Sequence, residues 1–313
     1  MVERPLVSIL VPCYNAAPWL ASTLESALQQ SWPRIEIIVV DDGSSDNSLE
    51  IARGFEPRGV RVFAQANSGA ASARNHALRH AKGDFIQFLD ADDLLAPDKI
   101  ERQLNALARV PLDTLAAGEW ARFIGDPETA VFQHEAIYNA STGIEFLQIH
   151  YETGSMMQPG GWLAPRSLLD RAGPWNEALT LNDDGEYFAR VMIAASCIAF
   201  TPGARCFYRA TPKSLSRRRD SRALVSLHRS VELTTDHLLK ADASPRTQAA
   251  AAYAWKWTAF ELYPDAIDLS RDAEEHAKTL GGSTRPFPGG RRFQFVARLL
   301  GWRIAKSLIL LVS

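Results

Sequence analysis

The sequence predicts an α/β fold with a mostly parallel central sheet. Along the first hundred residues, short runs of apolar and β-branched residues alternate with segments whose apolar residues recur at helical spacing. The first pattern is typical of strands buried on both faces, and the second of helices that cover a sheet. Regular alternation of the two gives βαβ units and parallel strand pairing.

The elements are expected in a fixed order. Ser44, Ser45 and Asp46 can cap the helix after the second strand, and Pro97 precedes the fourth helix. The expected strands are "LVSILV" (6–11), "IEIIVV" (35–40), "VRVFA" (60–64) and "FIQFL" (85–89). The expected helices cover residues 18–30, the segment with Leu49 and Ala52, residues 69–81, and the segment with Ile100, Leu104 and Leu107.

Composition and charge narrow the class of protein. The chain has 313 residues, of which 46% are hydrophobic and 22% charged, as in soluble globular proteins with a sizeable core. A net charge of −2 gives no indication of a nucleic-acid partner. Three widely spaced cysteines without a Cys-x-x-Cys motif argue against a disulfide framework or zinc site, and favour a reducing, cytoplasmic location.

Neither a signal peptide nor a membrane-spanning helix is expected. The first apolar run is short, follows Glu3 and is interrupted by Pro12. No segment has the ~18 uninterrupted apolar residues that a spanning helix would show.

Polar residues follow each predicted strand. Pro12 to Asn15 follow the first strand, Asp41 and Asp42 the second, Asn67 to Gly69 the third, and Asp90 to Asp93 the fourth. In sheets of this kind ligands bind outside the carboxyl ends of the strands. Five carboxylates at one edge therefore predict a binding site.

The acidic strand ends suggest how a phosphate could be held. The chain has no Gly-x-Gly-x-x-Gly or Walker-type loop, so a conventional dinucleotide site is not expected. Asp90-Ala91-Asp92 supplies hard oxygen ligands that suit Mg²⁺ or Mn²⁺, which can bridge phosphate oxygens and neutralise a leaving diphosphate. An Asp-x-Asp sequence by itself can be a solvated turn. Its position beside a second acidic strand end favours the metal.

Three segments carry a resemblance to a known family. They are "VSILVPCYNAAPWLASTLESALQQSWPRIEIIVVDDGSSDNS", "NSGAASARNHAL" and "GDFIQFLDADD". Together they resemble family 2 glycosyltransferases of the GT-A fold, closely over about residues 1–110 and more loosely to about 216. The resemblance implies a Rossmann-like mixed sheet flanked by helices. It also implies inverting transfer of a sugar from a nucleotide-diphosphate donor, first of all a UDP-sugar, to a glycan or lipid-linked acceptor in polysaccharide or glycolipid synthesis.

The resemblance also implies roles in donor binding. Asp42 would accept a hydrogen bond from uracil, with Asp41 as its support. Asp92 would be the main ligand of Mn²⁺ or Mg²⁺, and Asp93 a less certain partner. The other residues expected at the donor are Pro12, Tyr14 and Asn15 against the base, Arg74 at the base or diphosphate, and Asp90 with Ala91 at the ribose or metal. Tyr14 could instead be an ordinary loop tyrosine, and Arg74 a solvated helix residue.

The second half contains a second acidic motif. "GPWNEALTLNDDGEYF" (173–188) resembles a family motif that commonly has a Glu-Asp pair, and Asp183-Asp184 departs from it at the first position. Asp184 would be the general base that takes the acceptor proton, and Glu186 could contribute. Both aspartates could instead cap the helix that follows. Trp162 and Trp175 could line the acceptor cleft or belong to the core.

A basic segment would close the donor site. "CFYRATPKSLSRRRD" (206–220) resembles the family's Tyr-Arg and Ser-x-Ser segment. Arg209 or the run 217–219 could meet the diphosphate, and the run could equally be a solvated basic face.

The expected organisation is a glycosyltransferase domain over 1–220, with a donor half (1–110) and an acceptor half (111–220), and a helical extension over 221–313. The extension ends in the basic, aromatic and amphipathic segment 291–313. Such a segment is typical of membrane-surface helices, which would make the protein peripheral on the cytoplasmic face, and its charges argue against spanning. Docking on the protein's own core or on a partner subunit stays open.

Rival interpretations remain. A nucleotidyltransferase that makes nucleotide sugars should have a Gly-rich basic loop after the first strand, where this chain has "PCYNAAPW" (12–19). A non-catalytic nucleotide-binding relative and a metal-free donor site are further alternatives.

Overall fold

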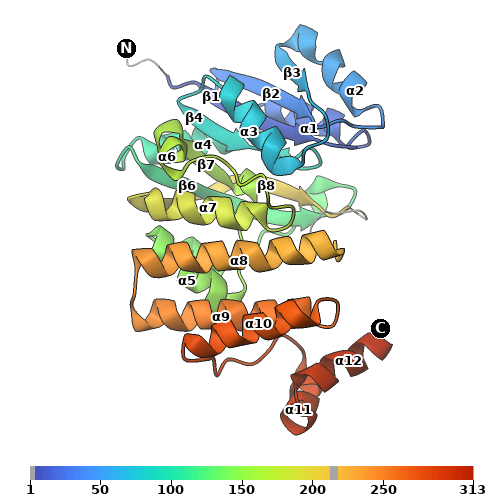
Figure 1. The fold of residues 1–313 in the computed structure, drawn as a ribbon. Helices are drawn as coiled ribbons and strands as arrows, with labels where there is room; N and C mark the ends of the chain where they lie inside the picture. Colours follow the sequence, from blue (N-terminus) through green and yellow to red (C-terminus); the bar gives the residue numbers. More distant parts are fainter. Residues whose placement is uncertain (1–3, 212–217, 313) are drawn as a thin grey trace.

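The computed structural model describes residues 4–211 and 218–312 and has an eight-stranded mixed sheet flanked by helices (Figure 1). The strand order is β3-β2-β1-β4-β7-β6-β8-β5. The strands are β1 Val7–Cys13, β2 Ile35–Asp41, β3 Val60–Ala64, β4 Phe85–Phe88, β5 Leu94–Leu95, β6 Thr114–Phe123, β7 Trp162–Pro165 and β8 Cys197–Arg209. The helices packed around them are α1 Leu20–Leu28, α2 Ser48–Gly54, α3 Ala70–His80, α4 Lys99–Leu107, α5 Gly143–Thr153, α6 Arg166–Ala172 and α7 Asp183–Ala194.

The first half of the sheet is parallel. β1 pairs in parallel with β2 and β4, and β2 pairs in parallel with β3. Alternate residues of β1 enter different cores: Leu10 packs in the cluster that contains α3, and Ile9 in the cluster that contains α1 and α4. Burial on both faces explains why these strands read as continuous apolar runs. It also places their polar carboxyl ends at one edge of the sheet.

The second half of the sheet mixes directions. β7 is antiparallel to β4 and β6, β8 is parallel to β6, and β5 is antiparallel to β8. In the last pair Leu94 lies opposite Phe207, which brings the acidic segment after β4 beside the end of β8. Residues about 110 apart in the sequence therefore meet at the candidate site.

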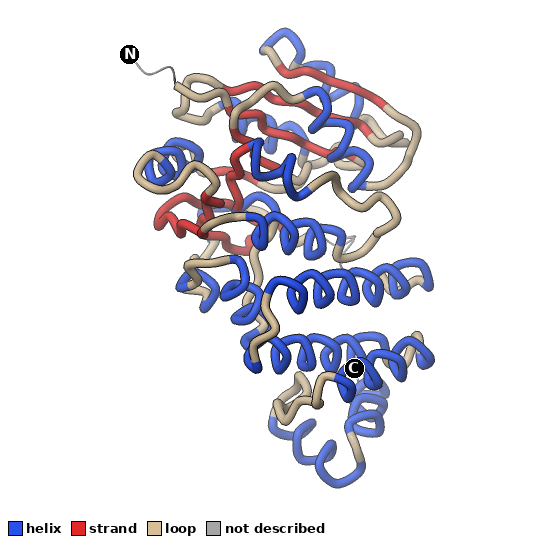
Figure 2. Tube along the Cα trace, turned by 60° about the vertical axis from the view of Figure 1, so that its left-hand side comes forward, coloured by secondary structure: helices blue, strands red, loops and turns tan. Residues whose placement is uncertain are grey.

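Three helices form further layers below the sheet: α8 Ser221–Ala241, α9 Pro245–Leu262 and α10 Ile267–Thr279. Figures 1 and 2 show the strands in the upper part of the molecule and this helical stack in the lower part. α8 packs on α7 on one side and on α9 on the other. The division at residue 220 therefore stays a prediction, because α8 shares an extensive contact with the preceding region.

Two features of the helical region differ from expectation. α10 was not anticipated, because its buried residues are the small Ser270, Ala273 and Ala277, and its large apolar residues Ile267 and Leu269 do not recur at helical spacing. The terminal segment is not one helix but two, α11 Arg291–Leu300 and α12 Trp302–Val312. They are separated by Gly301, whose φ of 85° lies in the left-handed region that glycine adopts freely. Among the described residues no helix is both long and apolar enough to cross a bilayer.

Candidate active site

The loops after β1 and β2 form one wall of the site. Asn15 has a left-handed backbone (φ 50°), and its amide N–H donates to Ser44 Oγ at 3.0 Å. Its side-chain oxygen accepts a hydrogen bond from the Ser45 amide at 2.8 Å. The two loops are thereby held together. Pro12 is buried in β1 opposite Val40, whereas Tyr14 is 52% exposed, which leaves its ring free to stack on a ligand.

The two aspartates at the end of β2 have different surroundings. Asp42 is buried, and its carboxylate accepts hydrogen bonds from the Gln65 side chain and from the amides of Ser68 and Gly69, each at 2.8 Å. It thus fastens the loop before α3. Asp41 is also buried; one oxygen accepts from the Ser44 amide at 3.1 Å, and Oδ1 has no donor among the described residues. Asp41 therefore has a buried acceptor without a partner in the part of the chain that the structure describes, and the contact of Asp42 with uracil stays a prediction.

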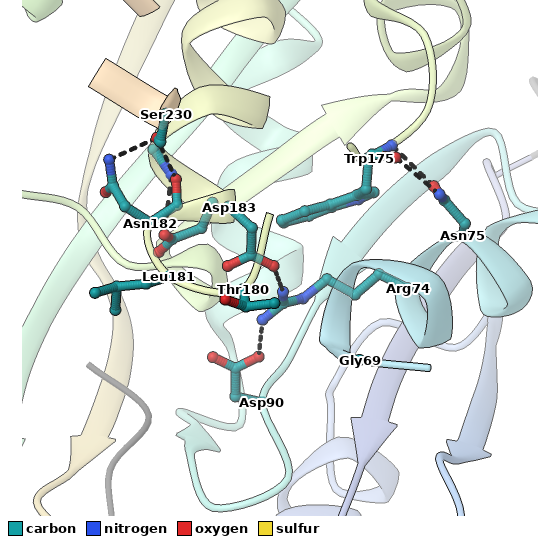
Figure 3. A network of polar contacts seen from close by, with 12 residues as sticks. Gly69, Arg74, Asn75, Asp90, Trp175, Thr180, Leu181, Asn182, Asp183 and Ser230 are labelled. Carbon is teal, nitrogen blue, oxygen red and sulfur yellow. Dashed lines mark hydrogen bonds and ion pairs between the residues drawn. The ribbon is translucent and has the colours of Figure 1, made fainter. Parts of the chain in front are cut away.

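Arg74 joins the two acidic motifs (Figure 3). Its guanidinium donates to Asp90 and to Asp183, each at 2.8 Å, and lies over the Trp175 ring at 4.4 Å from the centroid. Burial lowers the pKa of Arg74, but the charges of Asp90 and Asp183 outweigh this and raise it above its ordinary value. Arg74 is thus a buried, charged bridge between the segment after β4 and the start of α7 rather than a solvated helix residue.

Carboxylates accumulate after β4. Burial and the charge of Asp90 raise the pKa of Asp92 to about 6, and burial and Asp92 raise the pKa of Asp93 well above its usual range. Asp93 accepts from the Arg209 amide at 2.8 Å, and its Oδ2 has no partner among the described residues. Arg209 Nε donates to the Asp92 carbonyl at 2.7 Å. Arg209 therefore holds this loop in place and provides one positive charge beside it.

The donor set after β4 fits a divalent cation. In the described part of the chain no three His, Cys, Asp or Glu side chains are arranged to hold a metal by themselves. Mg²⁺ commonly takes one or two carboxylates and completes its shell with phosphates and water. Asp90 uses one oxygen for Arg74, and a cation beside Asp92 would offset the burial and the charge of Asp90 that together raise the pKa of Asp92. Asp90 and Asp92 have the chemistry that such an ion needs, and their role as its ligands stays a prediction.

Asp184 has the surroundings of a general base. It lies in the first turn of α7, and its carboxylate accepts a hydrogen bond from the Gly185 amide at 2.9 Å. Burial and the adjacent Asp183 raise its pKa to about 6. Since Asp183 is held by Arg74, Asp184 is the member of the pair without an ion-pair partner among the described residues. A carboxylate with a pKa near the working pH is suited to accept a proton.

Asp184 lines a cavity of about 330 Å³ between the sheet region and the helical stack. The lining is mostly apolar, with Met156, Met157, Trp162 and Trp257 among its side chains and Glu261 at the α9 end. The walls come from α5, α7, α8 and α9, so no single stretch of sequence signals it. The contributions of α8 and α9 were missed by sequence reasoning for this reason.

The remaining predicted residues have distinct surroundings. Trp162 lines the cavity, whereas Trp175 is a core residue that stacks on Tyr187 at 4.0 Å between ring centroids. Glu186 is buried in an ion pair with Arg190 at 2.6 Å, which offsets the charge of its carboxylate, and its contribution at the acceptor stays a prediction. Arg217 lies outside the described residues, and its neighbours Arg218 and Arg219 form ion pairs with Asp220 and Glu261.

One positioning residue was not anticipated. Asn75 exchanges hydrogen bonds with the backbone of Trp175, receiving from its amide at 2.8 Å and donating to its carbonyl at 2.9 Å (Figure 3). It thereby fixes the segment that leads to Asp183. The sequence signal was its position directly after Arg74, which by itself does not identify a partner 100 residues away.

Three curated relatives are similar to this chain. A glycosyltransferase of Haemophilus influenzae is 48% identical over 107 residues, which cover 33% of this chain and 43% of that protein. EpsJ of Bacillus subtilis is 31% identical over 218 residues (68% of this chain, 63% of EpsJ), and the same organism's TuaG, named as a putative teichuronic acid biosynthesis glycosyltransferase, is 35% identical over 177 residues (50% and 67%). The similar region thus spans between about two fifths and two thirds of these relatives.

Solved structures confirm the GT-A-type fold. Staphylococcus aureus TarS residues 1–349 match with a TM-score of 0.68 and 17% identity over 98% of this chain and 92% of that one, and TarS has also been solved with UDP-GlcNAc. The Pyrobaculum calidifontis mannosyltransferase PcManGT, solved with GDP-Man and Mn²⁺, matches with a TM-score of 0.56 and 20% identity over 98% and 84%. The family model described as glycosyl transferase family 2 matches residues 8–172, more than half of the chain. The protein therefore belongs to glycosyl transferase family 2.

Proposed function

We propose that the protein transfers a sugar from a nucleotide-diphosphate sugar, with a UDP-sugar as the expected donor, to an acceptor hydroxyl with inversion. One observation carries the proposal. Arg74 pairs with Asp90 of the donor motif and Asp183 of the second acidic motif, which leaves Asp184 unpaired beside the cavity. A single free carboxylate facing the acceptor side is what a one-step displacement needs.

The donor would bind along the carboxyl ends of β1, β2 and β4. The exposed Tyr14 ring offers a stacking surface for the base. Asp41 Oδ1, a buried acceptor without a partner among the described residues, suits an N–H of the base better than the Asp42 carboxylate, which already accepts three hydrogen bonds. Support for a UDP-sugar comes from the UDP-GlcNAc complex of TarS, although PcManGT has been solved with GDP-Man.

Asp184 would act as the base in the transfer step. The acceptor hydroxyl oxygen attacks the anomeric carbon as the bond from that carbon to the diphosphate oxygen breaks. The acceptor proton passes to Asp184, and the nucleoside diphosphate leaves with the bonding electrons. A divalent cation held by Asp90 and Asp92 would stabilise the negative charge on the diphosphate. Arg209 adds a fixed positive charge at this loop.

The acceptor is proposed to have an apolar part. The cavity at Asp184 is lined mainly by methionine, aromatic and aliphatic side chains, which suits a lipid-linked glycan or similar amphiphile better than a free polar sugar. A role in cell-surface polysaccharide or glycolipid synthesis is consistent with the name of TuaG. The free thiols of Cys13, Cys197 and Cys206 agree with a cytoplasmic location.

Calorimetric titration with UDP, GDP and dTDP, with and without Mn²⁺, tests the donor site. We expect UDP to bind most tightly, in a Mn²⁺-dependent manner, and Asp92→Ala to lose the Mn²⁺ effect. Asp268→Ala is the matched control, because this carboxylate is fully exposed on α10. Preference for another nucleotide would keep the transferase and overturn the UDP assignment. No nucleotide binding would overturn the proposed function, and binding without release of UDP from any UDP-sugar would favour a non-catalytic relative.

A further inference from the structure

The exposed large apolar side chains of this protein are concentrated in its last two helices. Among the described residues fifteen large apolar side chains are exposed, and eight of them lie between residues 291 and 311. The eight are Phe295, Leu299, Leu300, Ile304, Leu308, Ile309, Leu310 and Leu311. Scattered exposed apolar residues are ordinary, but a contiguous group marks an interaction surface. Figures 1 and 2 show α11 and α12 at the end of the helical stack, remote from the parallel strands.

One face of this helix pair is already occupied by the protein itself. Phe293 packs edge-on against Phe260 of α9, with 5.6 Å between ring centroids. The Trp302 indole N–H donates to Glu274 of α10 at 3.1 Å, and Ala305 is buried. Docking on the protein's own core therefore accounts for these residues and leaves the exposed apolar group uncovered.

The exposed group has the distribution of an interfacial helix. Ile304, Leu308 and Leu311 follow one another at helical spacing and form one stripe on α12. Residues 308 to 311 are all exposed. Because four consecutive residues make about one turn of a helix, their side chains point to all sides of α12. A flat protein partner would cover one side of such a turn, whereas acyl chains can surround it.

The charges within the terminal segment itself have one sign. Residues 291–313 contain five basic and no acidic residues. Arg303 forms an ion pair with Glu274 at 2.8 Å, whereas Arg291, Arg292 and Arg298 are exposed and have no ion-pair partner within residues 4–211 and 218–312. A second copy docked through the same surface would place like charges against each other. An anionic surface would complement them.

We propose that α11 and α12 lie in the headgroup region of an anionic lipid bilayer, with the exposed leucine, isoleucine and phenylalanine side chains inserted and the arginines at the phosphates. The protein would be held on the membrane surface by these helices without spanning it, in agreement with their length and charge. Membrane binding is independent of sugar transfer. It would nevertheless bring Asp184 to the place where a lipid-linked acceptor resides.

Vesicle co-sedimentation of the full chain tests the proposal. The probes are vesicles of phosphatidylcholine alone and vesicles that also contain phosphatidylglycerol. We expect preferential binding to the anionic vesicles, weakened by salt. The triple variant Leu299→Glu, Ile304→Glu, Leu308→Glu should abolish it. The matched control Leu112→Glu, at a side chain 92% exposed elsewhere on the surface, should bind as the unmodified protein does.

A second variant separates the charges from the apolar side chains. Replacing Arg291, Arg292 and Arg298 by alanine should lower the affinity for anionic vesicles by about fivefold per arginine, about 100-fold in all, and remove most of the salt dependence. Circular dichroism and nucleotide titration of each variant verify that the fold and the donor site are intact.

Three results would overturn the proposal. The first is that the same fraction of the protein stays in the supernatant with the anionic vesicles as with the phosphatidylcholine vesicles. The second is binding that the leucine and isoleucine variant retains. The third is a dimer in light scattering that the triple variant converts to a monomer without any vesicle binding, because the surface would then be a contact between two copies of the chain. Each result is read without an activity assay and so leaves the proposed function untouched.

Discussion

Replacing Asp184 by asparagine should stabilise the protein while abolishing its proposed activity. Burial and the neighbouring Asp183 raise the pKa of Asp184 to about 6 from its ordinary value of 3.8. The folded state therefore disfavours the charged carboxylate relative to the unfolded state. Asparagine keeps an oxygen that can accept from the Gly185 amide, and it removes the charge.

The expected magnitude follows from the pKa difference. Two pKa units correspond to about 3 kcal/mol, which is the upper limit of the stabilisation at neutral pH. Because the side chain still meets the open cavity, we expect about 1 to 2 kcal/mol, or a rise in Tm of roughly 2 to 4 °C for a chain of this size. The free-energy cost of the charged carboxylate is present at pH values above the pKa of Asp184 in the folded state. It is absent at pH values below the pKa of Asp184 in the unfolded state. The advantage of the variant should therefore shrink to about half near pH 5.

Thermal and denaturant unfolding at two pH values measure this effect. Asp183→Asn is the matched control, since Asp183 pairs with Arg74 at 2.8 Å and its loss should destabilise the protein by about 1–3 kcal/mol. Two adjacent aspartates should thus give changes of opposite sign. If Asp184→Asn is destabilising, or if its effect does not change between the two pH values, Asp184 is not the strained, unpaired carboxylate that the proposed mechanism needs.

Other predictions concern the same site and its support. Release of UDP from a UDP-sugar should increase as the pH rises through about 6 and level off above it, because Asp184 must be deprotonated to act as the base; a flat profile between about pH 5 and 8 would contradict this role. Arg74→Lys should lower the free energy of unfolding by about 2–3 kcal/mol in urea titrations, since an ammonium cannot bridge two carboxylates and also stack on an indole; an unchanged midpoint would argue against the bridge. Gly143→Ala should lower stability by about 2 kcal/mol or more, because the added methyl group would overlap the Met192 carbonyl. Gly54→Ala, whose methyl group meets nothing within 4 Å, should instead be neutral or stabilising by up to about 1 kcal/mol in the same titration.

The position of the donor carboxylates could be predicted from sequence because it depends on local rules. Buried parallel strands leave a strong apolar signal, and the residues after each strand necessarily meet at one edge of the sheet. The sequence alone places Asp41, Asp42, Asp90 and Asp92 at this edge. It does not identify their hydrogen-bond partners, since a partner such as the Gly69 amide for Asp42 depends on how a loop folds back.

The acceptor side shows where sequence reasoning ends. The sequence left Trp175 open between the acceptor cleft and the core, and it allowed Glu186 a contribution because Glu186 shares a helical turn with Asp184. In the structure Trp175 packs in the core and Glu186 forms an ion pair with Arg190. Glu186 does so because successive side chains of a helix point in different directions. Conversely, Trp257 reaches the cavity from a helix more than 70 residues further along the chain.

By itself, the sequence determined the α/β class, the order of the first four strands and helices, the acidic edge and the basic character of the terminal segment. These are properties of hydrophobic periodicity, turn residues and charge, which act over a few neighbouring residues. Tertiary structure decided which of two adjacent aspartates is free. Asp183 meets Arg74 across 109 residues of sequence and Asp184 does not. The tertiary structure also decided that contacts with α9 and α10 bury only part of the apolar surface of the terminal helices. Both outcomes depend on long-range packing, in which the partner of a side chain is chosen by the fold of the whole chain rather than by its neighbours in sequence.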